Sequence, residues 1–143
     1  MEGEWFIGVV VPARNEALFI RKVLETIPDF VDCIVVVNDG STDGTLEEIQ
    51  AAKCSSNLIE VHLDGQGVGA AIDAGHQALL EHFDDPFVSV VMAGDGQMNP
   101  DDLRTLIAPI ISGHSDHVKG NRFAHTDGPG GMPKHRQLAS KIL

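Results

Sequence analysis

Runs of apolar residues without polar alternation recur along the chain and are its strongest structural signal. The first run, Phe6 to Val11, contains three consecutive valines and ends at Pro12. A short run that is apolar on both faces is typical of a strand buried inside a parallel sheet. This pattern predicts strands over residues 6–11, 31–37, 58–63 and 87–92, and a fifth, shorter strand over His117–Lys119.

The segments between these runs have helical spacing instead. Helices are predicted over residues 16–27, 45–52, 67–83, 99 to about 112, and 133–143. Pro28 closes the first of them, and Asp43 is the expected N-cap of the second. Asn99 followed by Pro100 is a helix start, and Pro109 is expected to distort the same helix near its end.

The order of these elements is strand and helix in alternation, which predicts an α/β fold. Buried strands joined by helices indicate a three-layer αβα sandwich with a mostly parallel sheet, and residues 1–143 are expected to form a single domain. In such sheets ligands bind beyond the carboxyl ends of the strands. Ligand-binding residues are therefore expected in the segments that follow the strands, which cover residues 12–16, 38–43, 63–69, 93–97 and 120–122.

Charge and composition narrow the classes of function. A net charge of −11 argues against nucleic-acid binding. No apolar stretch approaches a membrane span and the start of the chain is acidic, so a cytoplasmic location is expected, with Cys33 and Cys54 as free thiols. Residues 120–143 are basic and are expected to be partly flexible. An acidic body with a basic tail is typical of a solvated surface, but it also fits a metal site facing a cationic strip for phosphates.

Asp39 is the most informative single residue. It ends the second strand, within Asn38-Asp39-Gly40-Ser41-Thr42-Asp43-Gly44. A strand, a turn and a capped helix explain Asp43, but they explain Asp39 poorly. A carboxylate at the mouth of a parallel sheet is a usual ligand contact, and it can accept a hydrogen bond from an N–H of a nucleobase.

Five ordered motifs together resemble the family 2 glycosyltransferases of the GT-A fold, and most closely the polyprenyl- and dolichyl-phosphate sugar synthases. The motifs are Pro12-Ala13-Arg14-Asn15-Glu16, the segment 38–45 around Asp39, Gly67-Val68-Gly69-Ala70-Ala71-Ile72 with Gly75, Met92-Ala93-Gly94-Asp95-Gly96-Gln97-Met98-Asn99-Pro100, and Lys119-Gly120-Asn121-Arg122-Phe123 with Arg136. They span nearly the whole chain.

The resemblance implies roles for individual residues. Pro12, Ala13, Asn15 and Glu16 would line a nucleotide pocket, Asp39 would meet the base, and Gly67, Gly69 and Gly94 would let the backbone approach the nucleotide sugar. Asp95 would bind Mg²⁺ or Mn²⁺, with Gln97 as a helper, because hard oxygen ligands suit these ions. Arg122 and Arg136 would lie near the diphosphate and the acceptor phosphate and serve catalysis together with Asp95.

The implied activity is transfer of a sugar, with inversion, from a UDP- or GDP-linked donor to an acceptor such as a polyprenyl phosphate at the cytoplasmic face of a membrane. The chain departs from the family in one respect, because many relatives carry Asp-x-Asp where this sequence has Ala93-Gly94-Asp95. It is also short at its C-terminus. Both features leave open a catalytically silent nucleotide-sugar-binding or interaction module, a truncated fragment without the acceptor site, and a half-domain that dimerises to cover its edge.

Other readings fit the motifs less well. Gly67-Val68-Gly69 lacks the third glycine of a dinucleotide fingerprint and follows the third strand, so a Rossmann oxidoreductase is disfavoured. The segment 95–102 lacks the ligand spacing of an EF-hand. A response-regulator receiver would need an acidic pair after the first strand and an aspartate at the end of the third, where this chain has Pro12-Ala13-Arg14 and His62-Leu63, with Asp64 nearby. A sugar nucleotidyltransferase would need a glycine-rich first loop.

Overall fold

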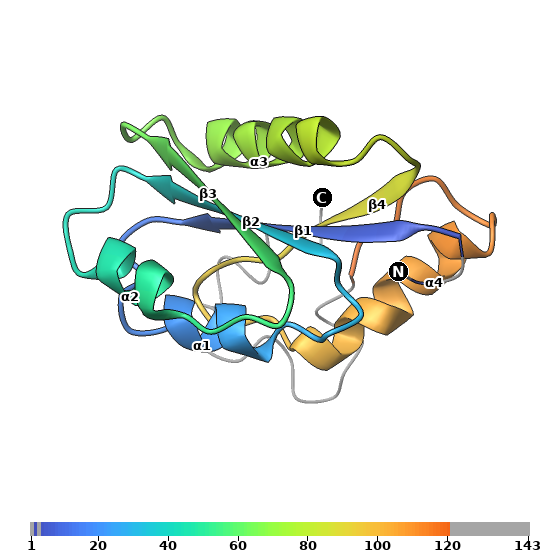
Figure 1. Cartoon of the computed structure of the whole chain (residues 1–143), viewed down its shortest axis with the longest axis horizontal. Coiled ribbons are helices and arrows are strands. Elements are labelled where there is room, and N and C mark those ends of the chain that lie inside the picture. Colours follow the sequence, from blue (N-terminus) through green and yellow to red (C-terminus); the bar gives the residue numbers. More distant parts are fainter. Residues whose placement is uncertain (1, 3, 121–143) are drawn as a thin grey trace, which may run out of the picture.

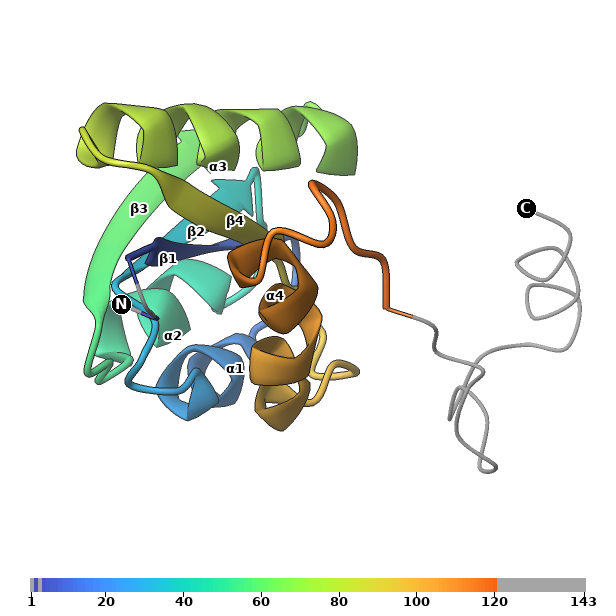
Figure 2. The ribbon, with the colours of Figure 1, turned by 90° about the vertical axis from the view of Figure 1, so that its right-hand side faces the viewer.

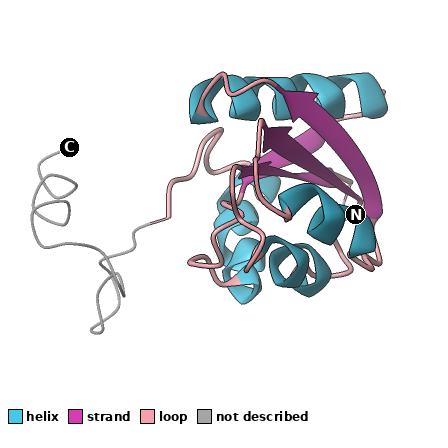
Figure 3. Cartoon of the chain, turned by 90° about the vertical axis from the view of Figure 1, so that its left-hand side faces the viewer, coloured by secondary structure: helices cyan, strands magenta, loops and turns pink. Residues whose placement is uncertain are grey.

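A four-stranded parallel sheet forms the centre of the computed structural model, which describes residue 2 and residues 4–120. The strands are β1 (Phe6–Ala13), β2 (Cys33–Asp39), β3 (Asn57–Leu63) and β4 (Phe87–Val91), in the order β3-β2-β1-β4. Every pairing is parallel, so all four carboxyl ends lie at one edge of the sheet (Figure 3).

Helices cover both faces of the sheet, as a doubly covered parallel sheet requires. Figures 1 and 2 show α3 (Val68–His82) on one face, and α1 (Ile20–Thr26), α2 (Thr45–Ala51) and α4 (Leu103–Ile111) on the other. A short 3-10 turn over Pro100–Asp102 leads into α4. The predicted fold class, an α/β sandwich of three layers, is therefore confirmed.

The two faces of β1 explain how the layers are held. Ile7, Val9 and Val11 pack in a large apolar core with α1, α2 and α4, while Val10 faces α3 in a second core. The α3 layer lies very close to the sheet, because a Cβ added to Gly75 would fall 2.2 Å from Val10 Cγ1. Gly75 thus permits tight packing of the helix against the sheet.

Two helix starts differ from their predictions. The first helix begins at Ile20 instead of Glu16, and the N-cap of α2 is Gly44, one residue after the predicted Asp43, whose Oδ1 still accepts from the Thr45 N–H at the start of α2. The backbone N–H groups of residues 15–17 donate instead to side chains of the following loop, namely Ser41 Oγ, Thr45 Oγ1 and Asp43 Oδ2. These hydrogen bonds between loops hold residues 15–17 outside the helix, while the Ile20 N–H donates to the Glu16 carbonyl and leads into α1.

The C-terminal predictions meet mixed outcomes. Asn99 accepts a hydrogen bond from the Asp101 N–H as a cap should, and Pro109 is accommodated inside α4. The predicted fifth strand over His117–Lys119 is wrong, because these residues form no strand and no described strand lies beyond β4 for them to pair with. The helix expected at residues 133–143 lies outside the described residues. Within the described part, no helix is long and apolar enough to cross a membrane.

Candidate functional site

Two loops at the carboxyl edge of the sheet are tied together by side chains. Asn15 Oδ1 accepts from the backbone N–H of Thr42 at 2.8 Å, and Asn15 itself adopts a left-handed conformation with φ of 54°. Asp43 accepts from the backbone N–H groups of Ala17 and Thr45 and from the Thr45 hydroxyl, and these bonds lower the pKa of its carboxyl. The result is a braced rim around the ends of β1 and β2.

Asp39 ends β2 and binds the loop that precedes α3. Its Oδ1 accepts from the Gln66 N–H and its Oδ2 from the Gly67 N–H, both at 2.7 Å. The side chain is only 3% exposed, and this desolvation by itself would raise its pKa. The hydrogen bonds from Gln66 and Gly67, with the nearby charge of Arg14, outweigh that effect and hold the pKa below its usual value. Asp39 is therefore an ionised carboxylate that accepts and cannot donate.

Gly67 supplies the backbone conformation that this contact needs. Its φ of 97° lies in the region that residues with a Cβ rarely adopt. The chain turns there so that two successive N–H groups point at the Asp39 carboxylate before α3 begins. The glycine thereby joins the end of β2 to the start of α3.

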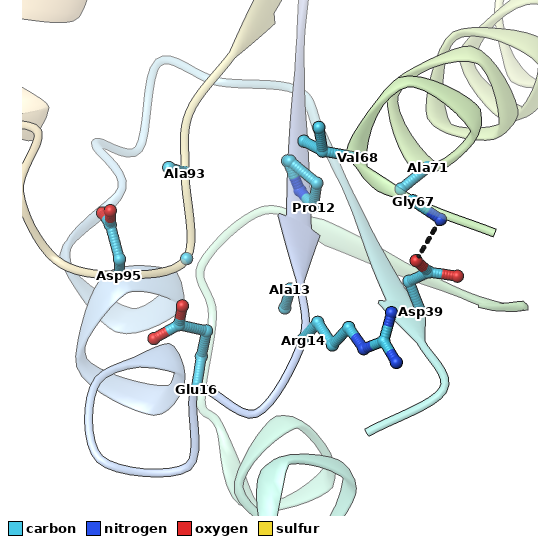
Figure 4. A pocket seen from close by; sticks show the side chains of 11 residues that line it. Pro12, Ala13, Arg14, Glu16, Asp39, Gly67, Val68, Ala71, Ala93 and Asp95 are labelled. Carbon is cyan, nitrogen blue, oxygen red and sulfur yellow. Dashed lines mark hydrogen bonds between the residues drawn. The ribbon is translucent and has the colours of Figure 1, made fainter. Parts of the chain in front are cut away.

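Arg14 lies beside Asp39 at the end of β1. Figure 4 shows its side chain extending toward the Asp39 carboxylate across the mouth of the sheet. A Cβ added to Gly65 would lie 3.4 Å from the guanidinium, so the Arg14 side chain lies within van der Waals distance of this position. This end of the site thus presents a fixed acceptor and a flat cationic donor next to each other.

A cleft of about 290 Å³ runs from this pair to the loop that follows β4. Its lining comes from the ends of β1 and β2, the start of α3 and the loop after β4: Pro12, Ala13, Arg14, Glu16, Asp39, Gly67, Val68, Ala71, Ala93, Gly94 and Asp95. Asp39 and Asp95, which are 56 positions apart in the sequence, therefore share one cavity. The Gly94 N–H donates to the Pro12 carbonyl at 3.3 Å and holds the far loop against β1.

The end of the cleft near Asp95 is acidic. Glu16 faces it from the β1 side (Figure 4), and desolvation followed by the charges of Asp95 and Asp43 raises the Glu16 pKa. Asp95 Oδ1 accepts from the Gln97 backbone N–H at 3.0 Å, which orients its carboxylate. Repulsion between these like charges is what a bound cation would relieve.

The described residues suit in part the divalent ion that the resemblance implies. Among the described residues, no group of three or more His, Cys, Asp or Glu side chains could hold a metal by itself. Two carboxylates, Asp95 and Glu16, do face the same end of the cleft, and such oxygens suit Mg²⁺ or Mn²⁺. The site fits an ion that takes its remaining ligands from a bound diphosphate and from water.

The structure separates the predicted site residues into three groups. Seven line the cleft, namely Pro12, Ala13, Glu16, Asp39, Gly67, Gly94 and Asp95. Three do not line it: Asn15 braces the rim, Gly69 is exposed at the start of α3, and Gln97 lines a neighbouring groove. Arg122 and Arg136 lie outside the described residues.

Sequence reasoning missed four lining residues. Arg14 stood inside a quoted motif without a role, and its position directly before Asn15 and Glu16 at a strand end was the available signal. Val68, Ala71 and Ala93 are small or apolar, and nothing in their residue type indicates a binding role. They form an apolar wall between the two polar ends of the cleft.

Comparison with known proteins agrees with this arrangement. The family model for Glycosyl transferase family 2 matches residues 8–142. Glycosyltransferase AglJ of Haloferax volcanii is 31% identical over 96% of this chain and 42% of its own length. The UDP-N-acetylglucosamine–dolichyl-phosphate N-acetylglucosaminyltransferase of Methanococcus voltae is 30% identical over 94% of this chain and 59% of its own length. The chain thus spans about half the length of these curated relatives.

Solved structures share the fold. Crystal structures of S. aureus TarS, one of them in complex with UDP, superpose with a TM-score of 0.59 and 22% sequence identity over 84% of this chain and 40% of theirs. At this level of identity the likeness concerns the fold alone.

Proposed function

The chain belongs to glycosyl transferase family 2, and from that premise we propose that its cleft binds a nucleotide-diphosphate sugar whose sugar is transferred, with inversion, to a lipid phosphate. The observation that carries this proposal is the shared cavity of Asp39 and Asp95. One polar end suits a nucleobase and the other suits a diphosphate with its cation, and an apolar wall lies between them.

The end at Asp39 is suited to a base that carries an N–H donor next to a carbonyl. An ionised Asp39 accepts from the N–H, and the Arg14 guanidinium can donate to the carbonyl or lie against the ring. Uracil and guanine offer this edge, whereas adenine and cytosine offer an unprotonated ring nitrogen there. The proposed donors are therefore UDP- or GDP-linked sugars, and two proteins named above are described with UDP or a UDP-sugar.

The end at Asp95 is suited to the leaving group. Asp95 and Glu16 would hold Mg²⁺ or Mn²⁺, which neutralises the negative charge of a departing nucleoside diphosphate. In the transfer, an oxygen of the acceptor phosphate forms a bond to the anomeric carbon while the bond from that carbon to the diphosphate breaks, and the electron pair leaves with the diphosphate. No proton has to move, because the acceptor phosphate is already anionic.

The acceptor class rests on two arguments. Among the described residues no histidine lines the cleft, the two carboxylates at its acidic end, Glu16 and Asp95, are assigned to the cation, and an anionic acceptor needs no further general base. The Methanococcus voltae relative is named for a dolichyl-phosphate acceptor. A lipid acceptor would place the protein at the cytoplasmic face of a membrane, and Arg122 and Arg136 are proposed to meet the phosphates.

Calorimetry with UDP, GDP, ADP and CDP, with and without Mn²⁺, tests the donor site. We expect UDP or GDP to bind more tightly when Mn²⁺ is present, and ADP and CDP to bind weakly. Asp95→Asn should weaken binding in Mn²⁺ by about ten- to hundredfold, the size expected for loss of a contact to a charged group. Asp101→Asn, an exposed acid on the next turn, is the matched control. An unchanged affinity in Asp95→Asn would remove the metal role.

A second candidate is a nucleotide-sugar-binding module without transferase activity. It is favoured by Ala93, which stands where many relatives have the first aspartate of Asp-x-Asp, and by the absence of a protein-only metal cluster in the described residues. A transfer assay with a radiolabelled donor separates the two candidates, because the module would bind the donor and release no product.

A further inference from the structure

A second groove of about 430 Å³ lies next to the cleft and has no role in the donor site described above. One wall is a face of α1, and the other is the loop that follows β4. We call it the α1 groove and define it by its ten lining residues: Phe19, Lys22, Val23, Thr26, Met92, Gly96, Gln97, Met98, Asn99 and Pro100. Five of the ten are apolar, three are uncharged polar residues, one is glycine and one is lysine.

The groove is unusual in exposing apolar surface. Phe19 is 47% exposed and Met98 is 39% exposed, and Leu18, which precedes Phe19 in the sequence but does not line the groove, is 88% exposed. These are three of the five large hydrophobic side chains that are exposed in the described part of the chain, the others being Val68 and Leu80. Exposed apolar side chains gathered around a groove indicate a binding surface.

Its charge is also unusual for this protein. The chain carries a net charge of −11, yet within residues 4–120 no carboxylate lines the groove, and Lys22 is its charged lining residue. On α1, Phe19, Lys22, Val23 and Thr26 share one helical face, whereas Glu25 pairs with Arg21 at 3.2 Å on another. The groove therefore suits a ligand that carries both an apolar stretch and an anionic group.

The groove and the donor cleft share a wall. Ala93, Gly94 and Asp95 line the cleft, and Gly96, Gln97 and Met98 continue directly into the groove. The Ala93 N–H contacts Met98 Sδ at 3.4 Å, and a Cβ added to Gly96 would lie 3.5 Å from the Phe19 ring. The loop that follows β4 would therefore separate a ligand in the groove from the diphosphate of the proposed donor in the cleft.

We propose that the α1 groove holds the isoprenoid chain of a prenyl phosphate acceptor, with Lys22 attracting its phosphate toward the end of the cleft near Asp95. This inference rests on the proposed transferase function and adds a site for the acceptor. The apolar walls bury the chain, and Lys22 matches the charge of the head group.

The test uses farnesyl phosphate, below the concentration at which it forms micelles, and protein labelled with ¹³C at the methionine methyl groups. We expect farnesyl phosphate to shift the Met98 methyl signal and to bind more tightly than geranyl and dimethylallyl phosphates. Phe19→Ser and Met98→Ser should each weaken binding about tenfold, as expected when a ligand loses a large apolar contact. Lys22→Glu should weaken the binding of farnesyl phosphate but leave the binding of farnesol unchanged.

Matched controls separate the groove from general surface effects. Leu80→Ser removes an exposed apolar side chain on the opposite face of the sheet, and Lys53→Glu reverses an exposed lysine elsewhere. Both should leave farnesyl phosphate binding unchanged. Nucleotide binding in Mn²⁺ should survive in every groove variant, so a failure of the groove is distinguishable from a failure of the donor site.

Three outcomes would overturn the proposal. Farnesyl phosphate could bind equally well to wild type, Phe19→Ser and Met98→Ser. Leu80→Ser could weaken the binding of farnesyl phosphate as much as the groove variants do. Sedimentation could also show a dimer that Phe19→Ser dissociates, in which case a second copy of the chain and not a lipid occupies the groove.

Discussion

Asp39 Oδ2 accepts a hydrogen bond from the Gly67 backbone N–H at 2.7 Å, which joins the end of β2 to the first turn of α3. Together with the hydrogen bond from the Gln66 N–H, this contact gives Asp39 a structural role in addition to its proposed contact to the base. A substitution at Asp39 must therefore be measured for stability and for binding separately.

Replacing Asp39 with Asn should lower the melting temperature at neutral pH. The amide offers one acceptor and one donor group, so one of the two N–H contacts is lost. The folded pKa of Asp39 lies below 3.8, so its contribution to stability is present above that value and is lost as pH falls through the folded pKa. The stability gap between wild type and Asp39→Asn should therefore narrow in acid. Thermal unfolding across pH checks this, with the exposed Asp73→Asn as control.

Replacing Arg14 with Gln should weaken nucleotide binding by a few fold. Arg14 helps to hold the Asp39 pKa down and lines the cleft beside it, but it is exposed, and exposed charge contacts contribute only about 0.2–1 kcal/mol. Calorimetry with UDP and GDP is the measurement. Arg21→Gln removes a comparable cation on α1, and an equal loss in that variant would show that the effect is nonspecific.

Replacing Glu16 with Gln should raise the melting temperature at neutral pH while weakening nucleotide binding in Mn²⁺. Desolvation and the charges of Asp95 and Asp43 raise the folded pKa of Glu16 above 4.5, so this residue costs stability as pH rises from below 4.5 through the folded pKa. The gain should vanish at a pH below 4.5. Melting curves with and without Mn²⁺ and UDP test both the gain in stability and the loss of nucleotide binding. The exposed Glu81→Gln should change neither the melting temperature nor the binding.

Two glycines of α3 should respond to alanine in opposite ways. Gly75→Ala should destabilise the protein by about 1–3 kcal/mol, because the new methyl group would overlap Val10. Gly69→Ala meets no atom within 4 Å and should stabilise the helix by up to about 1 kcal/mol. Urea unfolding measures both. If the backbone at Gly69 passes close to the nucleotide sugar, the stabilised Gly69→Ala variant should bind UDP less tightly, and unchanged binding would remove Gly69 from the site.

The local pattern of the sequence was enough to predict the layers of the fold. Val9, Val10 and Val11 face both cores in turn, so an uninterrupted apolar run predicted a strand covered on both sides. The rule that parallel strands share a carboxyl edge then predicted that Asp39 and Asp95 would lie in one region, and they line one cleft. Their roles in binding stay predictions.

Features that depend on contacts between loops escaped prediction. The start of α1 shifted to Ile20 because side chains of residues 41–45 bind the N–H groups of residues 15–17. The same contacts turn Asn15 toward Thr42 and away from the cleft. Periodicity describes one segment at a time, and it carries no information about which loop will supply a partner for another.

The position of β1 in the sheet has a consequence for how the chain folds. β1 pairs with β2 on one side and with β4 on the other, and its pairing of Phe6 with Phe87 joins residues 81 positions apart. During synthesis the edge of β1 that pairs with β4 stays unpaired until α3 and β4 have been made. Closure of this long loop should dominate the time of refolding, and variants that weaken β4 should slow folding more than variants that weaken β3.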